Sequence, residues 1–61
     1  MLYDKIKALA DKKGLSIYAV EKAVGLGNKT IRNWQTSSPS VANLKLVADY
    51  LGTTIDELMK D

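Results

Sequence analysis

Apolar residues recur at helical spacing along most of the chain, in short runs separated by glycines or polar turns. The first run predicts a helix over about residues 2–13, which Gly14 ends. Ser16 is a suitable N-cap for a second helix over about residues 17–24, and Gly25 stands where a helix ends in a left-handed residue. The side chains expected to face inward from these two helices are Leu2, Ile6, Leu9, Ala10, Val20 and Val24.

The next segment predicts a third helix over residues 28–35, with Gly27 as a tolerable N-cap. At about 100° per residue, Ile31 and Trp34 lie on one face of this helix, and we expect both in the core. The opposite face carries the polar side chains of Asn28, Lys29, Arg32 and Asn33. One face therefore anchors the helix, and the other presents two amides and two cations.

Two more helices complete the pattern. Ser40 predicts the N-cap of a fourth helix over about residues 41–51, which Gly52 closes. Thr54, followed three residues later by Glu57, forms a capping box that opens a short last helix. The side chains expected to face inward from the fourth helix are Val41, Leu44, Val47, Ala48 and Leu51.

No strand alternation or internal repeat competes with this pattern, which predicts an all-α fold. We expect a compact five-helix bundle that contains a helix-turn-helix and forms a single domain over residues 1–61. The chain has no cysteine and no histidine, so disulfides, the usual zinc-ligand sets and the familiar nucleophile–base pairs are missing. We therefore expect no enzyme activity, no metal and no cofactor. The uncharged stretches, residues 14–20 among them, are all too short to span a bilayer.

Charge is unevenly distributed along the chain. Residues 1–36 carry seven Lys or Arg against three acids, a balance of +4, whereas residues 37–61 carry two against four, a balance of −2. Such a difference suggests that one end of the molecule faces a polyanion, although many solvated surfaces look the same. The polar residue types of the third helix suit DNA, because asparagine pairs with adenine and lysine or arginine donates to guanine. A solvated amphipathic helix would look similar, but the place of this helix in a tight turn pair favours DNA reading.

The chain resembles the lambda-repressor/Cro-like family of helix-turn-helix proteins, also called the XRE family. The resemblance rests on residues 15–34, LSIYAVEKAVGLGNKTIRNW, and continues over residues 39–44, 47–52 and 55–58. It implies a five-helix bundle whose dimers bind operator DNA as transcriptional repressors or regulators. It also implies a cytoplasmic protein of bacterial or phage origin.

The resemblance implies which residues contact DNA. The family's base-reading positions fall here on Asn28, Lys29 and Asn33, with Arg32 beside them. Phosphate contacts fall at the start of the second helix and around the third. The residues predicted to contact phosphates are Ser16, Ile17, Tyr18, Thr30, Thr36, Ser37 and Ser38. For Tyr18, a half-exposed packing role is an alternative to a phosphate contact.

Two residues depart from the family pattern. Ile17 replaces a glutamine that often bonds a phosphate, although backbone amides at a helix start can still bind phosphate. Glu21 replaces the alanine that usually packs where the two helices cross. The carboxylate of Glu21 must therefore turn outward or find a partner.

A second function remains open from the sequence. Leu46, Tyr50 and Met59 are apolar residues off the expected core, and they form a candidate homodimer patch. The same bundle could instead act as a protein-interaction module, such as an antitoxin-like or antirepressor-type partner. The chain could also be the DNA-binding part of a longer repressor.

Overall fold

Helices make up most of the structure, a computed structural model that describes residues 1–60. Among these residues there are four α-helices, one short 3-10 helix and no strand. The all-α fold is therefore confirmed, and the predicted bounds of the first, second and fourth helices hold to within one residue. Asp61, which belongs to the predicted domain, lies outside the described residues. In chain order the elements are α1 (Leu2–Lys12), α2 (Ile17–Ala23), the 3-10 helix η1 (Arg32–Gln35), α3 (Val41–Leu51) and α4 (Ile55–Met59).

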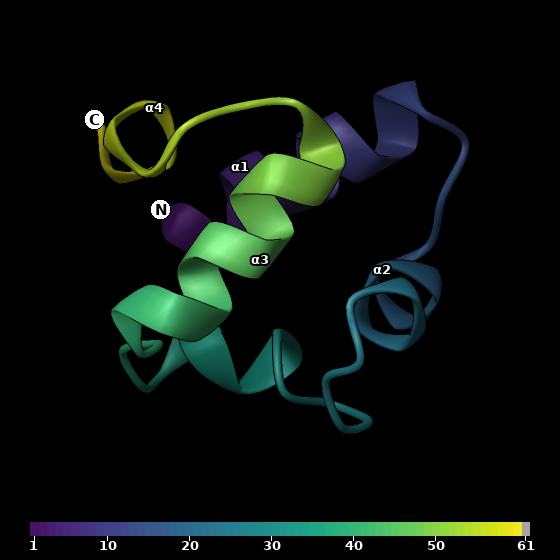
Figure 1. Ribbon diagram of the computed structural model, residues 1–61, viewed down its shortest axis with the longest axis horizontal. Coiled ribbons are helices and arrows are strands. Elements are labelled where there is room, and N and C mark those ends of the chain that lie inside the picture. Colours follow the sequence, from purple (N-terminus) through teal and green to yellow (C-terminus); the bar gives the residue numbers. More distant parts are fainter. Residues whose placement is uncertain (61) are drawn as a thin grey trace.

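The helices pack around a common centre. In Figure 1, α3 crosses in front of α1, with α4 on one side of it and α2 on the other. Helix α1 contacts α2, α4 and η1, and α3 contacts both α2 and α4. Helix α1 therefore forms the back of the molecule in this view, and α2, η1 and α4 all pack against it.

Three helices begin at the N-caps that the sequence predicts. In each case the cap hydroxyl oxygen accepts a hydrogen bond of 3.0–3.1 Å from the backbone N–H three residues later. The bonded pairs are Ser16 with Ala19, Ser40 with Asn43 and Thr54 with Glu57. The helix ends also agree with the sequence, since Gly25 and Gly52 adopt the left-handed φ values of +78° and +74°.

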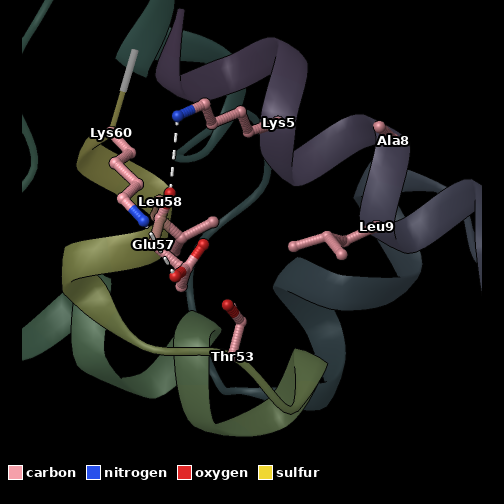
Figure 2. A pocket seen from close by; sticks show the side chains of 7 residues that line it. All are labelled: Lys5, Ala8, Leu9, Thr53, Glu57, Leu58 and Lys60. Carbon is pink, nitrogen blue, oxygen red and sulfur yellow. Dashed lines mark hydrogen bonds and ion pairs between the residues drawn. The ribbon is translucent and has the colours of Figure 1, made fainter.

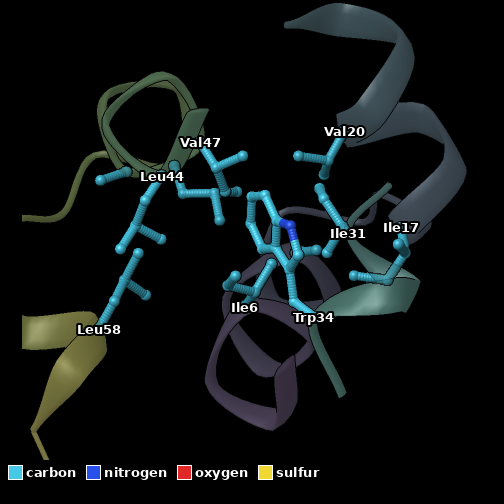
Figure 3. Packing of buried hydrophobic residues seen from close by; sticks show 11 residues of the cluster. Ile6, Ile17, Val20, Ile31, Trp34, Leu44, Val47 and Leu58 are labelled. Atoms are coloured by element: carbon cyan, nitrogen blue, oxygen red, sulfur yellow. The ribbon is translucent and has the colours of Figure 1, made fainter. Parts of the chain in front are cut away.

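The core joins every helix of the bundle. Figure 3 shows the Trp34 indole in the middle of this cluster, which includes residues of α1, α2, α3 and α4. The predicted inward residues are buried or half-buried with one exception, Val41, which is 73% exposed. Val41 is the first residue of α3, and side chains in a helix lean toward its N-terminus. Its side chain therefore points past the end of the core.

The third helix differs from its prediction. Residues 28–31 form a turn, and only Arg32–Gln35 are helical, with 3-10 geometry. The reason is Lys29, whose φ of +70° lies in the left-handed region and cannot continue a right-handed helix. The prediction of an α-helix over residues 28–35 is therefore wrong in type, although Ile31 and Trp34 still share a face. Residues three apart are aligned in a 3-10 helix as well.

Candidate nucleic-acid interface

Residues 28–35, named here the recognition segment, have one buried and one exposed face. Ile31 is fully buried and Trp34 is 8% exposed, so both belong to the core. The polar side chains predicted to read bases are all exposed: Asn28, Lys29, Arg32 and Asn33. These four side chains therefore present two amides and two cations to solvent from an anchored backbone.

The backbone of the recognition segment is held by short-range hydrogen bonds. The Thr30 N–H donates to the Gly27 carbonyl at 3.2 Å, which closes the turn that contains Lys29. The Asn33 N–H donates to the Lys29 carbonyl at 2.9 Å, which joins the turn to η1. A non-glycine residue in the left-handed region costs roughly 1–3 kcal/mol and persists only when its surroundings hold it there. Lys29 thus requires a further constraint on this turn.

Glu21 supplies that constraint. Its side chain is 1% exposed, and its two carboxylate oxygens accept hydrogen bonds from two different backbone amides. One oxygen accepts from the Lys29 N–H at 3.2 Å, and the other accepts from the Ile31 N–H at 2.8 Å. Burial of an unpartnered carboxylate would be very costly, and these charge-assisted bonds offset that cost. Of the two alternatives that the sequence left open for Glu21, the structure shows the second, a partner.

A signal for this buried role was present in the sequence. Ile17, Val20, Glu21 and Val24 follow the spacing of the inward stripe of a helix. Ile17 and Val20 are buried, and Glu21 lies in the same stripe. An acidic residue inside an apolar stripe needs hydrogen-bond donors nearby, but the helical pattern alone does not say which donors. The sequence pattern therefore indicates that Glu21 is unusual, but it does not identify the recognition segment as its partner.

The exposed charges of residues 12–36, which include the recognition segment, are all positive. Residues 12–36 contain five Lys or Arg and a single acid, and that acid is the buried Glu21. Elsewhere lysines pair with carboxylates at 3.4 Å, as Lys45 does with Asp49. Within residues 1–60, Lys29 and Arg32 take part in no such ion pair. The helix-turn-helix therefore presents an uncompensated positive surface, which favours binding of a polyanion.

The predicted phosphate-contacting residues divide into three groups. Thr30 is half-buried. The exposed residues are Ser16, Tyr18, Thr36, Ser37 and Ser38. The Tyr18 ring also packs beneath Lys22, whose Nζ lies 5.9 Å from the ring centroid. The Ile17 side chain is only 7% exposed and belongs to the core, so a phosphate contact at Ile17 would have to use the backbone.

The residues of the candidate dimer patch are all exposed. The exposed fractions of Leu46, Tyr50 and Met59 are 42–60%. Leu46 and Tyr50 belong to α3, and Met59 is the last residue of α4. Met59 also lines a hollow together with Val41, the first residue of α3.

The described residues also form a pocket between α1 and α4. Figure 2 shows this pocket between α1, α4 and the loop that precedes α4, with Lys5 and Lys60 at its rim. Both lysines already bond Glu57, one at its carbonyl oxygen and the other at its carboxylate, at 3.4 Å each. The recognition segment contributes no residue to this pocket. Over residues 1–60 there is no cluster of three potential metal ligands. No helix in that range is both long and apolar enough to cross a membrane.

Comparison with known proteins agrees with this geometry. The sequence profile of a helix-turn-helix family matches residues 6–58, which is most of the chain and includes α2, the recognition segment and α3. Neither the curated proteins nor the solved structures gave a match. The matched family is of the DNA-binding, transcription-regulating type, and it is not an enzyme family. The chain belongs to the lambda-repressor/Cro-like, or XRE, family of helix-turn-helix proteins.

Proposed function

We propose that this protein is a sequence-specific transcriptional regulator, a repressor of the Cro and phage-repressor type, that reads the DNA major groove with residues 28–35. The observation that carries the proposal is the two-faced recognition segment. Ile31 and Trp34 fix its backbone to the core, while its polar side chains are exposed. In helix-turn-helix proteins the second element of the pair enters the major groove and its first residues contact base edges.

Each of the four side chains proposed to read bases has a matching base. The amides of Asn28 and Asn33 can each donate to and accept from adenine, and the cations of Lys29 and Arg32 can donate to guanine O6 and N7. Hydroxyl groups on either side of the segment would position the protein by bonding phosphates, without reading sequence. The proposed phosphate contacts are Ser16, Ile17 through its backbone, Tyr18, Thr30, Thr36, Ser37 and Ser38.

Most of the binding free energy would come from the positive surface. Each phosphate neutralised by a lysine or arginine releases counterions, so affinity falls steeply as salt rises. The five cations of residues 12–36 are the natural source of this attraction, because no exposed acid lies among them. We expect this electrostatic attraction to act on DNA of any sequence. The recognition segment would supply the preference for particular bases.

The regulator would act as a homodimer in the cytoplasm of a bacterium, encoded by the host or by a phage. A two-fold dimer would read two half-sites about 10 base pairs apart, or a multiple of that spacing, on one side of the duplex. The proposed dimer surface uses the exposed apolar side chains of Leu46, Tyr50 and Met59.

Selection of bound sequences from a random duplex pool tests the proposal. On the selected site, Asn33→Ala and Lys29→Ala should each weaken binding by about 1–3 kcal/mol and relax the preference at one base position. Lys45→Ala is the matched control, because Lys45 is an exposed lysine of α3 that pairs with Asp49. If both variants weaken all sequences equally, the base-reading residues are wrongly assigned. If the protein does not associate with random duplex DNA at low salt, the regulator is excluded and a protein-interaction module is favoured.

A further inference from the structure

We propose that Glu21 is a positioning residue for DNA reading: its buried carboxylate holds Lys29 in the left-handed conformation and thereby sets the direction of the base-reading side chains. The inference rests on the proposed function, to which it adds a residue that itself touches no DNA. Glu21 is 1% exposed and belongs to α2, the first helix of the pair.

The geometry of the two hydrogen bonds supports this role. The carboxylate bridges the amides of Lys29 and Ile31. The φ and ψ rotations of Lys29, the left-handed residue, lie between these two N–H groups along the backbone. If Lys29 moved to a right-handed conformation, the two N–H bonds would no longer point at one carboxylate. The bridge therefore selects the Lys29 conformation at φ +70°. This conformation sets the direction in which the Lys29 side chain leaves the backbone relative to η1.

Glu21→Gln is the sharpest test, because it keeps the size of the side chain and replaces one acceptor oxygen by a donor. The one remaining side-chain oxygen should stay with the Ile31 N–H, which makes the shorter of the two hydrogen bonds. The new NH2 group of the glutamine would then face the Lys29 N–H. Two donors then face each other, and the Lys29 turn should shift. We expect the affinity for the selected site to fall by about tenfold while the affinity for random DNA changes by less than about twofold.

Glu57→Gln is the matched control. It makes the same chemical change and removes the same charge, but the Glu57 carboxylate is exposed and pairs with Lys60 at 3.4 Å. This variant should keep the ratio of selected-site to random-DNA affinity. If Glu21→Gln keeps that ratio as well, at a temperature where it is fully folded, Glu21 is only a packing residue and the inference is wrong.

Amide hydrogen exchange separates this inference from the proposed function and does not require DNA. In the unmodified protein, the Lys29 and Ile31 amides should both exchange slowly; in Glu21→Gln, the Lys29 amide should exchange at least about tenfold faster while Ile31 stays protected. If Glu21→Gln does not fold, the unmodified protein still decides: unprotected Lys29 and Ile31 amides would overturn the bridge. If these amides exchange slowly but the protein binds no DNA, the bridge exists and the proposed regulator is refuted. The role of Glu21 in DNA reading would then fall with the proposed function.

Discussion

The C-terminal helices and the recognition segment hold their first amides in different ways. Helices α3 and α4 start at hydroxyl caps, Ser40 and Thr54, which bind an amide only three residues later. The amides of the recognition segment are bound by Glu21, a side chain of another helix that lies eight and ten residues earlier in the chain. The C-terminal half is thus capped locally, and the recognition segment is capped through tertiary structure.

This difference has a consequence for function. A local cap stabilises its helix whatever the rest of the molecule does, so α3 needs only a continuous inward stripe to be a regular helix. A cap from another helix couples the conformation of the recognition segment to the packing of α2. The segment can then adopt a left-handed turn at Lys29 that its own sequence does not favour. The recognition segment thus combines an irregular helical geometry with a fixed placement of its side chains.

The largest test of the comparison removes the anchor of the recognition segment. Trp34→Ala should cost about 3–5 kcal/mol, because it leaves a cavity in the centre of the core. A domain of this size has a total stability of roughly 3–9 kcal/mol, so most of the fold's stability would be lost. Thermal or urea unfolding followed by circular dichroism measures this effect. A loss below about 1 kcal/mol would mean that the indole is not a core residue.

The sequence predicted those parts of the fold that depend on neighbours along the chain. Ser16, Ser40 and Thr54 were identified as caps because hydroxyl caps act over three residues, and the structure confirms all three. The burial of Ile31 and Trp34 was also predicted, because a spacing of three puts them on one face in either helix type.

The parts that the sequence did not predict depend on distant contacts. The left-handed turn at Lys29 follows from Glu21 and not from any residue type that favours this conformation. Val41 fits the apolar stripe of α3, yet it is exposed because it is the first residue of that helix and its side chain points past the end of the core. For the site, exposure of the polar side chains followed from periodicity, whereas the assignment to bases and phosphates stays a prediction.

A pair of substitutions at Lys29 measures the strain in the recognition segment. Lys29→Ala and Lys29→Gly both remove the cation, but only glycine adopts φ of +70° without steric cost. The glycine variant should therefore be more stable than the alanine variant by roughly 1–2 kcal/mol. Chemical denaturation of both proteins gives this difference directly. Equal stabilities would show that Lys29 is not held in the left-handed region, and the contrast between the two halves would weaken.

Removal of the Ser40 cap tests how far a local cap acts. Ser40→Ala should lower the free energy of unfolding by about 1 kcal/mol, because the Asn43 amide loses its acceptor. Ser40 caps α3 and lies outside the recognition segment, so the ratio of selected-site to random-DNA affinity should not change. Denaturation and DNA titration on the same sample provide both numbers. A changed ratio would mean that local caps also shape the DNA-reading surface.

The smallest effect is expected where the charges are paired and exposed. Lys45 and Asp49 lie four residues apart on α3 at 3.4 Å, and both side chains are more than 60% exposed. Lys45→Ala should therefore change stability by only about 0.3–0.5 kcal/mol, since solvent and salt screen such pairs. Lys12→Ala makes the same change at a cation of the positive surface, and it should weaken binding to any DNA at low salt, as Lys45→Ala should not. If both variants weaken DNA binding equally, the positive charge acts through the whole molecule, and the division between a DNA-facing half and a supporting half does not extend to electrostatics.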